Sequence, residues 1–232
     1  MTYYHPLYMF SILIPLYNGV EFLEESVQSV IHQTNDQWEV LIGVNGHPPN
    51  SEVLTQAQQY MSDRIRVFDL PHVQGKSHAL NALVEYAANP YIAILDADDI
   101  WHPTKLDVQT EHIAAGYDVV GSRCIYFGER LNGVIPQTPV GDITLCDFFQ
   151  GNPVINSSAV IRRELVHWDY AYDGVEDYDL WLRLWKGGRR FYNCSQVLVK
   201  HRLHDQSAFN AKGNGDLVPG LLLYHQSIPH LK

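Results

Sequence analysis

Short apolar runs and amphipathic segments alternate along the first hundred residues of the chain. The apolar runs predict four strands: "FSILIPLY" (10–17), "WEVLIGV" (38–44), "IRVFDL" (65–70) and "YIAIL" (91–95). The segments between them, residues 18–34, 51–61 and 76–87, predict helices because their apolar residues recur at helical spacing. This alternation is typical of βαβ units, so we expect an α/β fold with a mostly parallel central sheet covered by helices on both faces.

The start of the first helix and the second half of the chain are less regular. Asn18 and Glu21 have the spacing of a capping box, which predicts a helix cap at Asn18. Further on, the pattern predicts a helix after Pro103, a strand at 117–127, a loop at 128–142 and an acidic helix at 176–188. Residues 157–165 read as a strand entering a helix, and 189–202 as one or two strands. We expect one domain over residues 1–232, with a mixed sheet in its second half.

Composition excludes several classes of protein. The 232 residues are 46% hydrophobic and carry a formal net charge of −10, which argues against a nucleic-acid-binding protein. No apolar run approaches the ~20 residues that cross a bilayer, and "MTYYHPLYMF" lacks the features of a signal peptide. The three cysteines are widely spaced and indicate buried thiols in a reducing compartment. We therefore expect a cytoplasmic protein, with contact to a membrane surface left open.

Three aspartates follow the fourth predicted strand. Asp96, Asp98 and Asp99 would lie at the carboxyl edge of the sheet, where α/β proteins bind ligands. Clustered carboxylates repel one another, and a divalent cation such as Mg²⁺ or Mn²⁺ removes that cost. The alternative is a set of acidic residues that simply favours the start of the next helix.

The order of five short motifs resembles an inverting family 2 glycosyltransferase with the GT-A fold. The motifs are "FSILIPLYN", a helix ending in "QT", "WEVLIGV", "ILDADD" and "EDYDLWLRL", and the resemblance covers roughly residues 10 to 207. It implies a nucleotide-binding half at about 10–100 and an acceptor-binding half at about 101–210. It also implies a Rossmann-like sheet, a nucleotide-sugar donor, and Mn²⁺ or Mg²⁺ as cofactor.

The resemblance assigns roles to the residues that follow the strands. Asp96, Ala97 and Asp98 form the Asp-x-Asp motif: Asp96 would contact the ribose and Asp98 the metal that bridges the diphosphate. His204 would lie near the metal and diphosphate. The turn of Pro15, Tyr17 and Asn18 would touch the nucleobase, and Lys76 or His78 would face the diphosphate or nucleoside. For each of these residues, a purely structural or solvent-exposed role is the alternative.

A second acidic cluster begins the helix at 176. Glu176 and Asp179 are three residues apart and share a face, whereas Asp177 points elsewhere. Sugar transfer to a hydroxyl needs a base within hydrogen-bond reach, and the resemblance assigns Asp177 to that role. The preceding "GNPVINSSAV" (151–160) is expected near the acceptor pocket. A loop at about 200–215 is expected to close over the donor and exclude water.

One departure from the family pattern concerns the nucleobase. The family usually carries two acidic residues and then Gly-Ser after the second strand, but here the chain reads Val44, Asn45, Gly46, His47. Asn45 can still hydrogen-bond a base through its amide. The missing carboxylate weakens the case for uridine; UDP remains the favoured nucleotide of the resemblance, and GDP and dTDP stay open.

The sequence leaves two alternatives and several substrates open. A sugar nucleotidyltransferase of similar architecture is one alternative, although "PLYNGVEFLEES" lacks the glycine-rich basic loop of that class. A non-catalytic module that binds a nucleotide sugar is the other. The acceptor would be a free hydroxyl on a glycan, lipid or protein. The donor sugar, the exact acceptor and the oligomeric state are left open.

Overall fold

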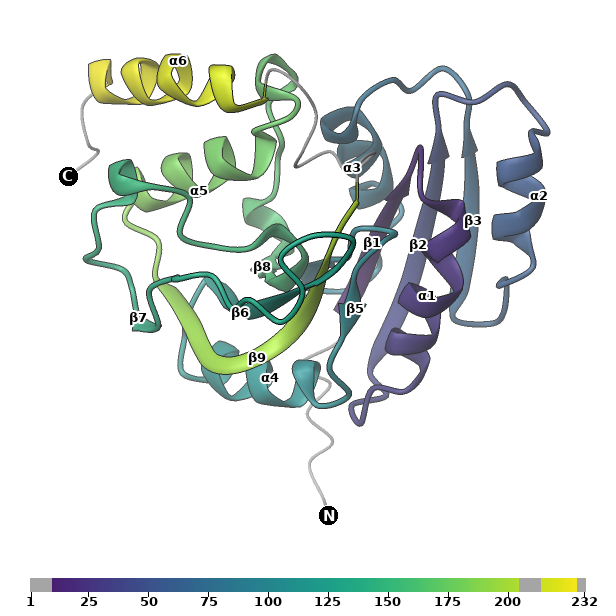
Figure 1. Ribbon diagram of the computed structural model, residues 1–232, viewed down its shortest axis with the longest axis horizontal. Helices are drawn as coiled ribbons and strands as arrows, with labels where there is room; N and C mark the ends of the chain where they lie inside the picture. The colour runs from purple at the N-terminus through teal and green to yellow at the C-terminus, as the bar shows by residue number, and fades with distance from the viewer. Residues whose placement is uncertain (1–9, 205–213, 229–232) are drawn as a thin grey trace.

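One sheet organises the protein in its computed structural model, which describes residues 10–204 and 214–228 (Figure 1). Over these residues the sheet has nine strands, in the order β3-β2-β1-β4-β8-β6-β9-β5, with β7 paired to β9. The strands are β1 (Phe10–Leu16), β2 (Trp38–Asn45), β3 (Ile65–Leu70), β4 (Tyr91–Ile94), β5 (Ile100–Trp101), β6 (Val119–Gly128), β7 (Gly141–Asp142), β8 (Val160–Arg162) and β9 (Phe191–Leu203). The α-helices are α1 (Leu23–Ile31), α2 (Glu52–Gln58), α3 (Lys76–Val84), α4 (Lys105–Ala114), α5 (Glu176–Lys186) and α6 (Asn214–Ser227).

The two halves of the sheet differ in strand direction. Strands β1 to β4 are all parallel to their neighbours in this half. In the second half β8 is antiparallel to β4 and β6, while β6 and β9 run parallel and lie side by side. The α/β fold with a mixed second half, expected from the sequence, is confirmed.

Successive side chains of the central strands enter two different cores. Ile12 and Ile14 of β1 pack in a cluster with residues of α1, α2 and α4. Leu13, between them, packs in a cluster with residues of α3 and α5 on the opposite face. This division follows from the alternation of side chains along a strand. It explains why "FSILIPLY" is apolar throughout, because both of its faces are buried.

The order of the first four strands creates a crevice for a ligand. The chain proceeds outward from β1 to β2 and β3, and then returns to place β4 on the other side of β1. β1 therefore lies between β2 and β4, and ligands bind at such a switch point in the strand order. The loop after β4 carries Asp96, Asp98 and Asp99.

Several local predictions were wrong. Gly19, at a φ of 87°, precedes a 3₁₀ turn (Val20–Phe22) that leads into α1, and no side chain caps that turn, so the expected capping box at Asn18 is absent. The backbone there needs a left-handed residue, which glycine supplies more readily than asparagine. After β8 the chain forms only a 3₁₀ turn, Arg163–Leu165, in place of a helix.

Helix α6 had no sequence signal, and its position depends on contacts with α5. Its His225 contacts the carboxylate of Asp179 at 2.8 Å, and Lys186 donates to the backbone carbonyls of His225 and Ile228. Pro219 lies inside this helix and weakens its intrinsic propensity. In the described part of the chain, none of the helices has the length and apolar character of a membrane span.

A buried lysine holds α4 against the strands behind the aspartate loop. Lys105 is fully buried, donates to Gln109 at 2.6 Å and lies 4.0 Å from the ring centre of Trp101. Gln109 in turn donates to the carbonyls of Val120 and Ser158, both at 2.8 Å. Burial lowers the pKa of Lys105 from 10.5 to about 7 because the interior disfavours the charged amine.

This lysine makes stability depend on pH. Between pH 7 and 10.5 the unfolded chain binds a proton at Lys105 that the folded chain does not, so stability rises with pH in that window. Lys105→Met removes this dependence. We expect its stability relative to wild type to fall by about 2–4 kcal/mol between pH 7 and pH 10, measured by urea unfolding. A matched change at exposed Lys200, Lys200→Met, should follow the wild-type curve, and a Lys105→Met curve parallel to wild type would contradict the assignment.

Candidate active site

Loops from three parallel strands meet at one edge of the sheet. Tyr17 and Asn18 follow β1, Asn45 ends β2, and the aspartate loop follows β4. Pro15 lies inside β1 opposite Gly43, and not in the turn after the strand as the sequence predicted. The ladder between β1 and β4 ends at Leu13, so Pro15 lies beyond it and its missing N–H costs no hydrogen bond on that side.

An aromatic pair lies exposed beside β2. The ring of Tyr17 is 56% exposed and lies 5.2 Å from the imidazole of His47. The ring also lies close over Gly46, where a Cβ would meet it at 3.2 Å. Asn45 is buried next to them. An exposed ring with a neighbouring amide can bind the face and the edge of a nucleobase. His47 was not predicted as a site residue.

Lys76 connects the aspartate loop after β4 to the acidic start of α5. At the N-terminus of α3, its ammonium lies 2.5 Å from Asp96 and 3.8 Å from Glu176. Burial alone would lower the pKa of Lys76, but the carboxylates of Asp96 and Glu176 raise it overall. Burial alone would likewise raise the pKa of Asp96, and Lys76 holds it below its ordinary value. His78, the alternative to Lys76, stacks on Tyr170 at 3.8 Å instead.

The end of β9 binds the aspartate loop. Asp99 is fully buried, accepts from the backbone N–H of Arg202 at 2.8 Å and contacts His201 at 2.9 Å. Asp98 contacts Nε2 of His204 at 3.0 Å. Burial alone would lower the pKa of His201, but Asp99 raises it to about 9, so His201 contributes positive charge at neutral pH. Ala97 is buried, and its carbonyl accepts from the hydroxyl of Ser26.

Asp98 and His204 fit one side of a divalent-cation site. Burial and the neighbouring Asp99 and Asp96 raise the pKa of Asp98 to about 6, and His204 and His201 offset this rise only in part. In the described ranges, no three His, Cys, Asp or Glu side chains gather closely enough to hold a metal by themselves. Mg²⁺ and Mn²⁺ often take one or two protein ligands and complete their shell with phosphates and water. The donor set fits a cation that arrives with a diphosphate.

The acidic residues of α5 separate into different environments. Asp179 is fully buried and pairs with Arg183 and His225, which is a structural role. Glu176 faces Lys76, and burial raises its pKa to about 7. Asp177 accepts a hydrogen bond from the side-chain amide of Asn152 at 2.9 Å. Burial raises the pKa of Asp177, although Asn152 and Lys76 act in the opposite direction. A partly buried carboxylate with a raised pKa is suited to accept a proton.

Two contacts lock α3 to the segment before α5. Asp173 accepts hydrogen bonds from the backbone N–H and the hydroxyl of Ser77, at 2.8 and 2.9 Å. The amide of Asn81 exchanges two hydrogen bonds with the backbone of Trp168. A Cβ at Gly75 would lie 2.5 Å from Asp173, so only glycine fits there. These contacts fix the position of Lys76 relative to the start of α5.

The structure therefore brings together most, but not all, of the predicted residues. Lys76 joins Asp96 to the α5 residues, and His204 contacts Asp98, whereas Tyr17 and Asn45 form a separate patch along the same edge. Sequence reasoning missed the partners of these groups. Asn152 and Asn156 lie in the segment expected near an acceptor. The sequence did not show that Asn152 donates to Asp177 or that Asn156 donates to Asp96 at 3.4 Å. Residues 205–213 of the loop expected at about 200–215 lie outside the described part of the chain.

Comparison with known proteins gives the same family as the motifs. Residues 11–167 match the family described as "Glycosyl transferase family 2". The chain is 27% identical over 215 residues to the UDP-Glc:alpha-D-GlcNAc-diphosphoundecaprenol beta-1,3-glucosyltransferase WfgD of Escherichia coli. The alignment covers 88% of this chain and 81% of WfgD. The family match ends before α5 and His204.

Two solved structures share the fold. Residues 1–349 of TarS of S. aureus, in complex with UDP, superpose with a TM-score of 0.72 at 15% identity, over 97% of this chain and 67% of that fragment. A mannosyltransferase from Pyrobaculum calidifontis in complex with GDP-Man and Mn²⁺ superposes with a TM-score of 0.65 at 18% identity. The superposition covers 88% of this chain and 60% of the mannosyltransferase chain. These similarities establish the GT-A fold.

The bond from Asn152 should be visible in the titration of Asp177. Because the amide stabilises the carboxylate, Asn152→Ala should raise the pKa of Asp177 further. The side-chain carboxyl carbon of Asp177, followed by NMR against pH, measures this shift. Gln150→Ala is the control, since the Gln150 amide bonds Asp147 and not Asp177. An unchanged titration in Asn152→Ala would show that this bond is not formed in solution.

Proposed function

Because this chain belongs to glycosyl transferase family 2 and is a glycosyltransferase, we propose that it moves a sugar from a nucleotide-diphosphate sugar to an acceptor hydroxyl with inversion. The observation that carries the proposal is the convergence of Asp96, Lys76 and the α5 carboxylates at one edge of the sheet. UDP is the favoured nucleotide, with GDP and dTDP open. Family membership favours this transfer over both a nucleotidyltransferase and a non-catalytic module.

The donor would lie across the carboxyl ends of β1, β2 and β4. The nucleobase packs on Tyr17 beside Asn45, and Asp96 faces the ribose. Lys76 and Arg202 supply positive charge near the diphosphate, in a protein whose formal net charge is −10. Asp98 and His204 would hold Mn²⁺ or Mg²⁺, which when bound stabilises the negative charge on the departing nucleotide.

Asp177 is the proposed base. It removes the proton from the acceptor hydroxyl as that oxygen forms its bond to the anomeric carbon and the bond to the diphosphate oxygen breaks. A single displacement from the opposite face inverts the anomeric configuration. Asn152 orients the carboxylate by its hydrogen bond to Asp177. The contacts of Asp173 and Asn81 join α3 to the segment before α5. They fix the position of the Asp177 carboxylate relative to the donor site.

The acceptor is proposed to be a glycan, lipid or protein hydroxyl presented in the cytoplasm, with the membrane surface as one location. The relative WfgD is named for a sugar acceptor on diphosphoundecaprenol. A screen that combines nucleotide sugars with free, lipid-linked and peptide-linked acceptors, and detects the released nucleotide diphosphate, tests the proposal. Release that depends on both donor and acceptor supports it, and no release with any pair contradicts it.

Removing the base should separate binding from turnover. Asp177→Asn keeps the size of the side chain and can still hydrogen-bond to Asn152 through its carbonyl oxygen. We expect turnover to fall roughly 10²- to 10⁴-fold, the usual contribution of a general base, while donor affinity by calorimetry stays within about threefold of wild type. The exposed control Asp63→Asn should behave as wild type. Near-normal turnover in Asp177→Asn would show that another group takes the proton.

The cation should tighten nucleotide binding through Asp98. Calorimetry with UDP should give a lower Kd with Mn²⁺ than with a chelator, because the cation neutralises the diphosphate beside the carboxylate. Asp98→Asn should lose most of this gain, roughly tenfold or more in Kd, and keep the metal-independent part. The exposed control Asp107→Asn should retain the gain. Equal UDP affinity with Mn²⁺ and with chelator in the wild-type protein would contradict a metal role for Asp98.

A further inference from the structure

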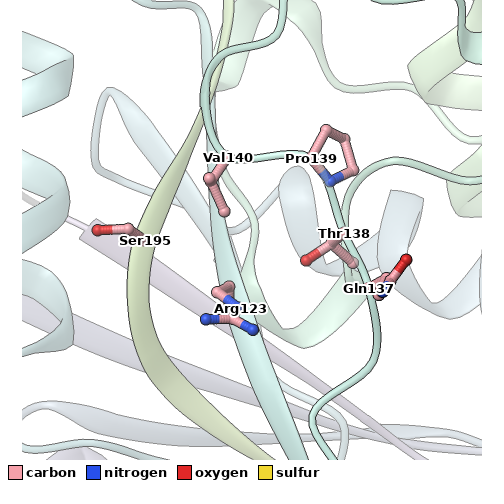
Figure 2. A pocket seen from close by; sticks show the side chains of 6 residues that line it. All are labelled: Arg123, Gln137, Thr138, Pro139, Val140 and Ser195. Carbon is pink, nitrogen blue, oxygen red and sulfur yellow. The ribbon is translucent and has the colours of Figure 1, made fainter.

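A cavity of about 590 Å³ lies between β6, β9 and the loop that joins β6 to β7. Figure 2 shows Arg123 of β6 between the strand that carries Ser195 and the loop of residues 137–140. The lining residues are Arg123, Gln137, Thr138, Pro139, Val140 and Ser195. None of them was assigned to donor binding or to proton transfer.

Arg123 lacks a counter-charge. Across residues 10–204 and 214–228, it is the one partly buried Lys or Arg side chain that makes no hydrogen bond and no ion pair. Other partly buried arginines are paired, as Arg162 is with Asp118 and Arg202 with Glu25. A guanidinium that has lost part of its hydration is stabilised by an anion that accepts from its N–H groups. The cavity therefore presents an unused anion-binding group.

Thr138 adds a second free donor. Its hydroxyl oxygen is buried and has no hydrogen-bond partner, and Figure 2 shows it on the side of the loop that faces Arg123. A hydroxyl can donate to an anion oxygen while the guanidinium binds two others. Several donors around a cavity of this size suit a phosphate group, which has more acceptor oxygens than a carboxylate.

One amide joins the cavity to the proposed base. The side-chain amide of Asn193 donates to the carbonyls of Pro139 and Pro153, both at 2.8 Å. Pro139 lines the cavity, and Pro153 follows Asn152, which bonds Asp177. The wall of the cavity and the residue that orients the base thus belong to one hydrogen-bonded unit.

The loop beside the cavity is apolar where it meets solvent. Four large apolar side chains between residues 131 and 140 are exposed: Leu131, Val134, Ile135 and Val140. The loop is held to β6 by hydrogen bonds between the backbones of Tyr126, Gly133 and Val134. Apolar side chains next to an unpaired guanidinium complement a molecule with an apolar chain and an anionic head.

We propose that this cavity binds the phosphate of a lipid-linked acceptor, whose apolar chain lies along residues 131–140 while its sugar hydroxyl lies at Asp177. The proposal rests on the proposed glycosyl transfer and specifies its acceptor class. Arg123 and Thr138 bind the phosphate and thereby distinguish acceptors that carry it from acceptors that do not.

Phosphate binding can be tested without turnover. The protein is saturated with UDP to occupy the donor site and titrated with inorganic phosphate, while the Nε–Hε signals of its arginines are followed by NMR. The Arg123 signal, assigned as the one missing from Arg123→Gln, should shift with phosphate and not with matched chloride. An Arg123 signal that responds alike to both salts would overturn the site.

Activity then tests the acceptor class. Two acceptors with the same sugar are compared, one as an alkyl glycoside and one as an alkyl diphosphate. Arg123→Gln should raise KM for the diphosphate acceptor roughly tenfold or more and leave KM for the glycoside and the donor unchanged. Arg189→Gln, an exposed control, should change neither. An equal rise for both acceptors, or no rise, would overturn the proposal.

The apolar loop distinguishes a lipid from a soluble phosphate. Val140→Ser should raise KM for the long-chain alkyl diphosphate and not for the methyl diphosphate of the same sugar. Equal KM values for both acceptors in the wild-type protein would overturn the lipid assignment. If no acceptor of any kind is glycosylated, the proposed function fails, whereas the NMR titration still decides whether Arg123 binds phosphate.

Discussion

The crowding of carboxylates at the carboxyl edge of β4 is the constraint on which the rest of the site depends. Asp96, Asp98 and Asp99 lie within four residues, and Glu176 and Asp177 approach them from α5. Burial, and then repulsion from neighbouring carboxylates, raise the pKa values of Asp98, Glu176 and Asp177. A fold built for stability alone would avoid this arrangement, because each shift is a cost to the folded state. The ionised carboxylates are stabilised when positive charge lies next to them.

The protein supplies part of that charge from distant segments of its chain. Lys76 from α3 neutralises Asp96, and the end of β9 brings the His201 side chain and the backbone N–H of Arg202 to Asp99. Asp98 is left with a histidine contact and a pKa raised to about 6. A cation bound with a diphosphate would complete the balance, which links the electrostatics of the fold to the chemistry proposed for a family 2 glycosyltransferase.

The sequence predicted what local patterns encode and missed what long-range contacts decide. The runs from "FSILIPLY" to "YIAIL" predicted β1 to β4 because burial on both faces leaves a continuous apolar signal. Asp98 and Asp177 could be named as candidates because each belongs to a short motif at the end or start of an element. No local pattern could show that Asn152 bonds Asp177 or that Asp173 caps α3, since both pairs depend on tertiary packing. The capping box at Asn18 failed because glycine at 19 changed the backbone there.

A crystal structure with UDP and Mn²⁺, recorded at the manganese absorption edge, tests the central claim most directly. The account predicts one anomalous peak within coordination distance of the Asp98 carboxylate and of both phosphates, with Lys76 close to the nucleotide. A nucleotide bound at this edge with manganese absent at saturating concentration, or with the peak away from Asp98, would contradict it.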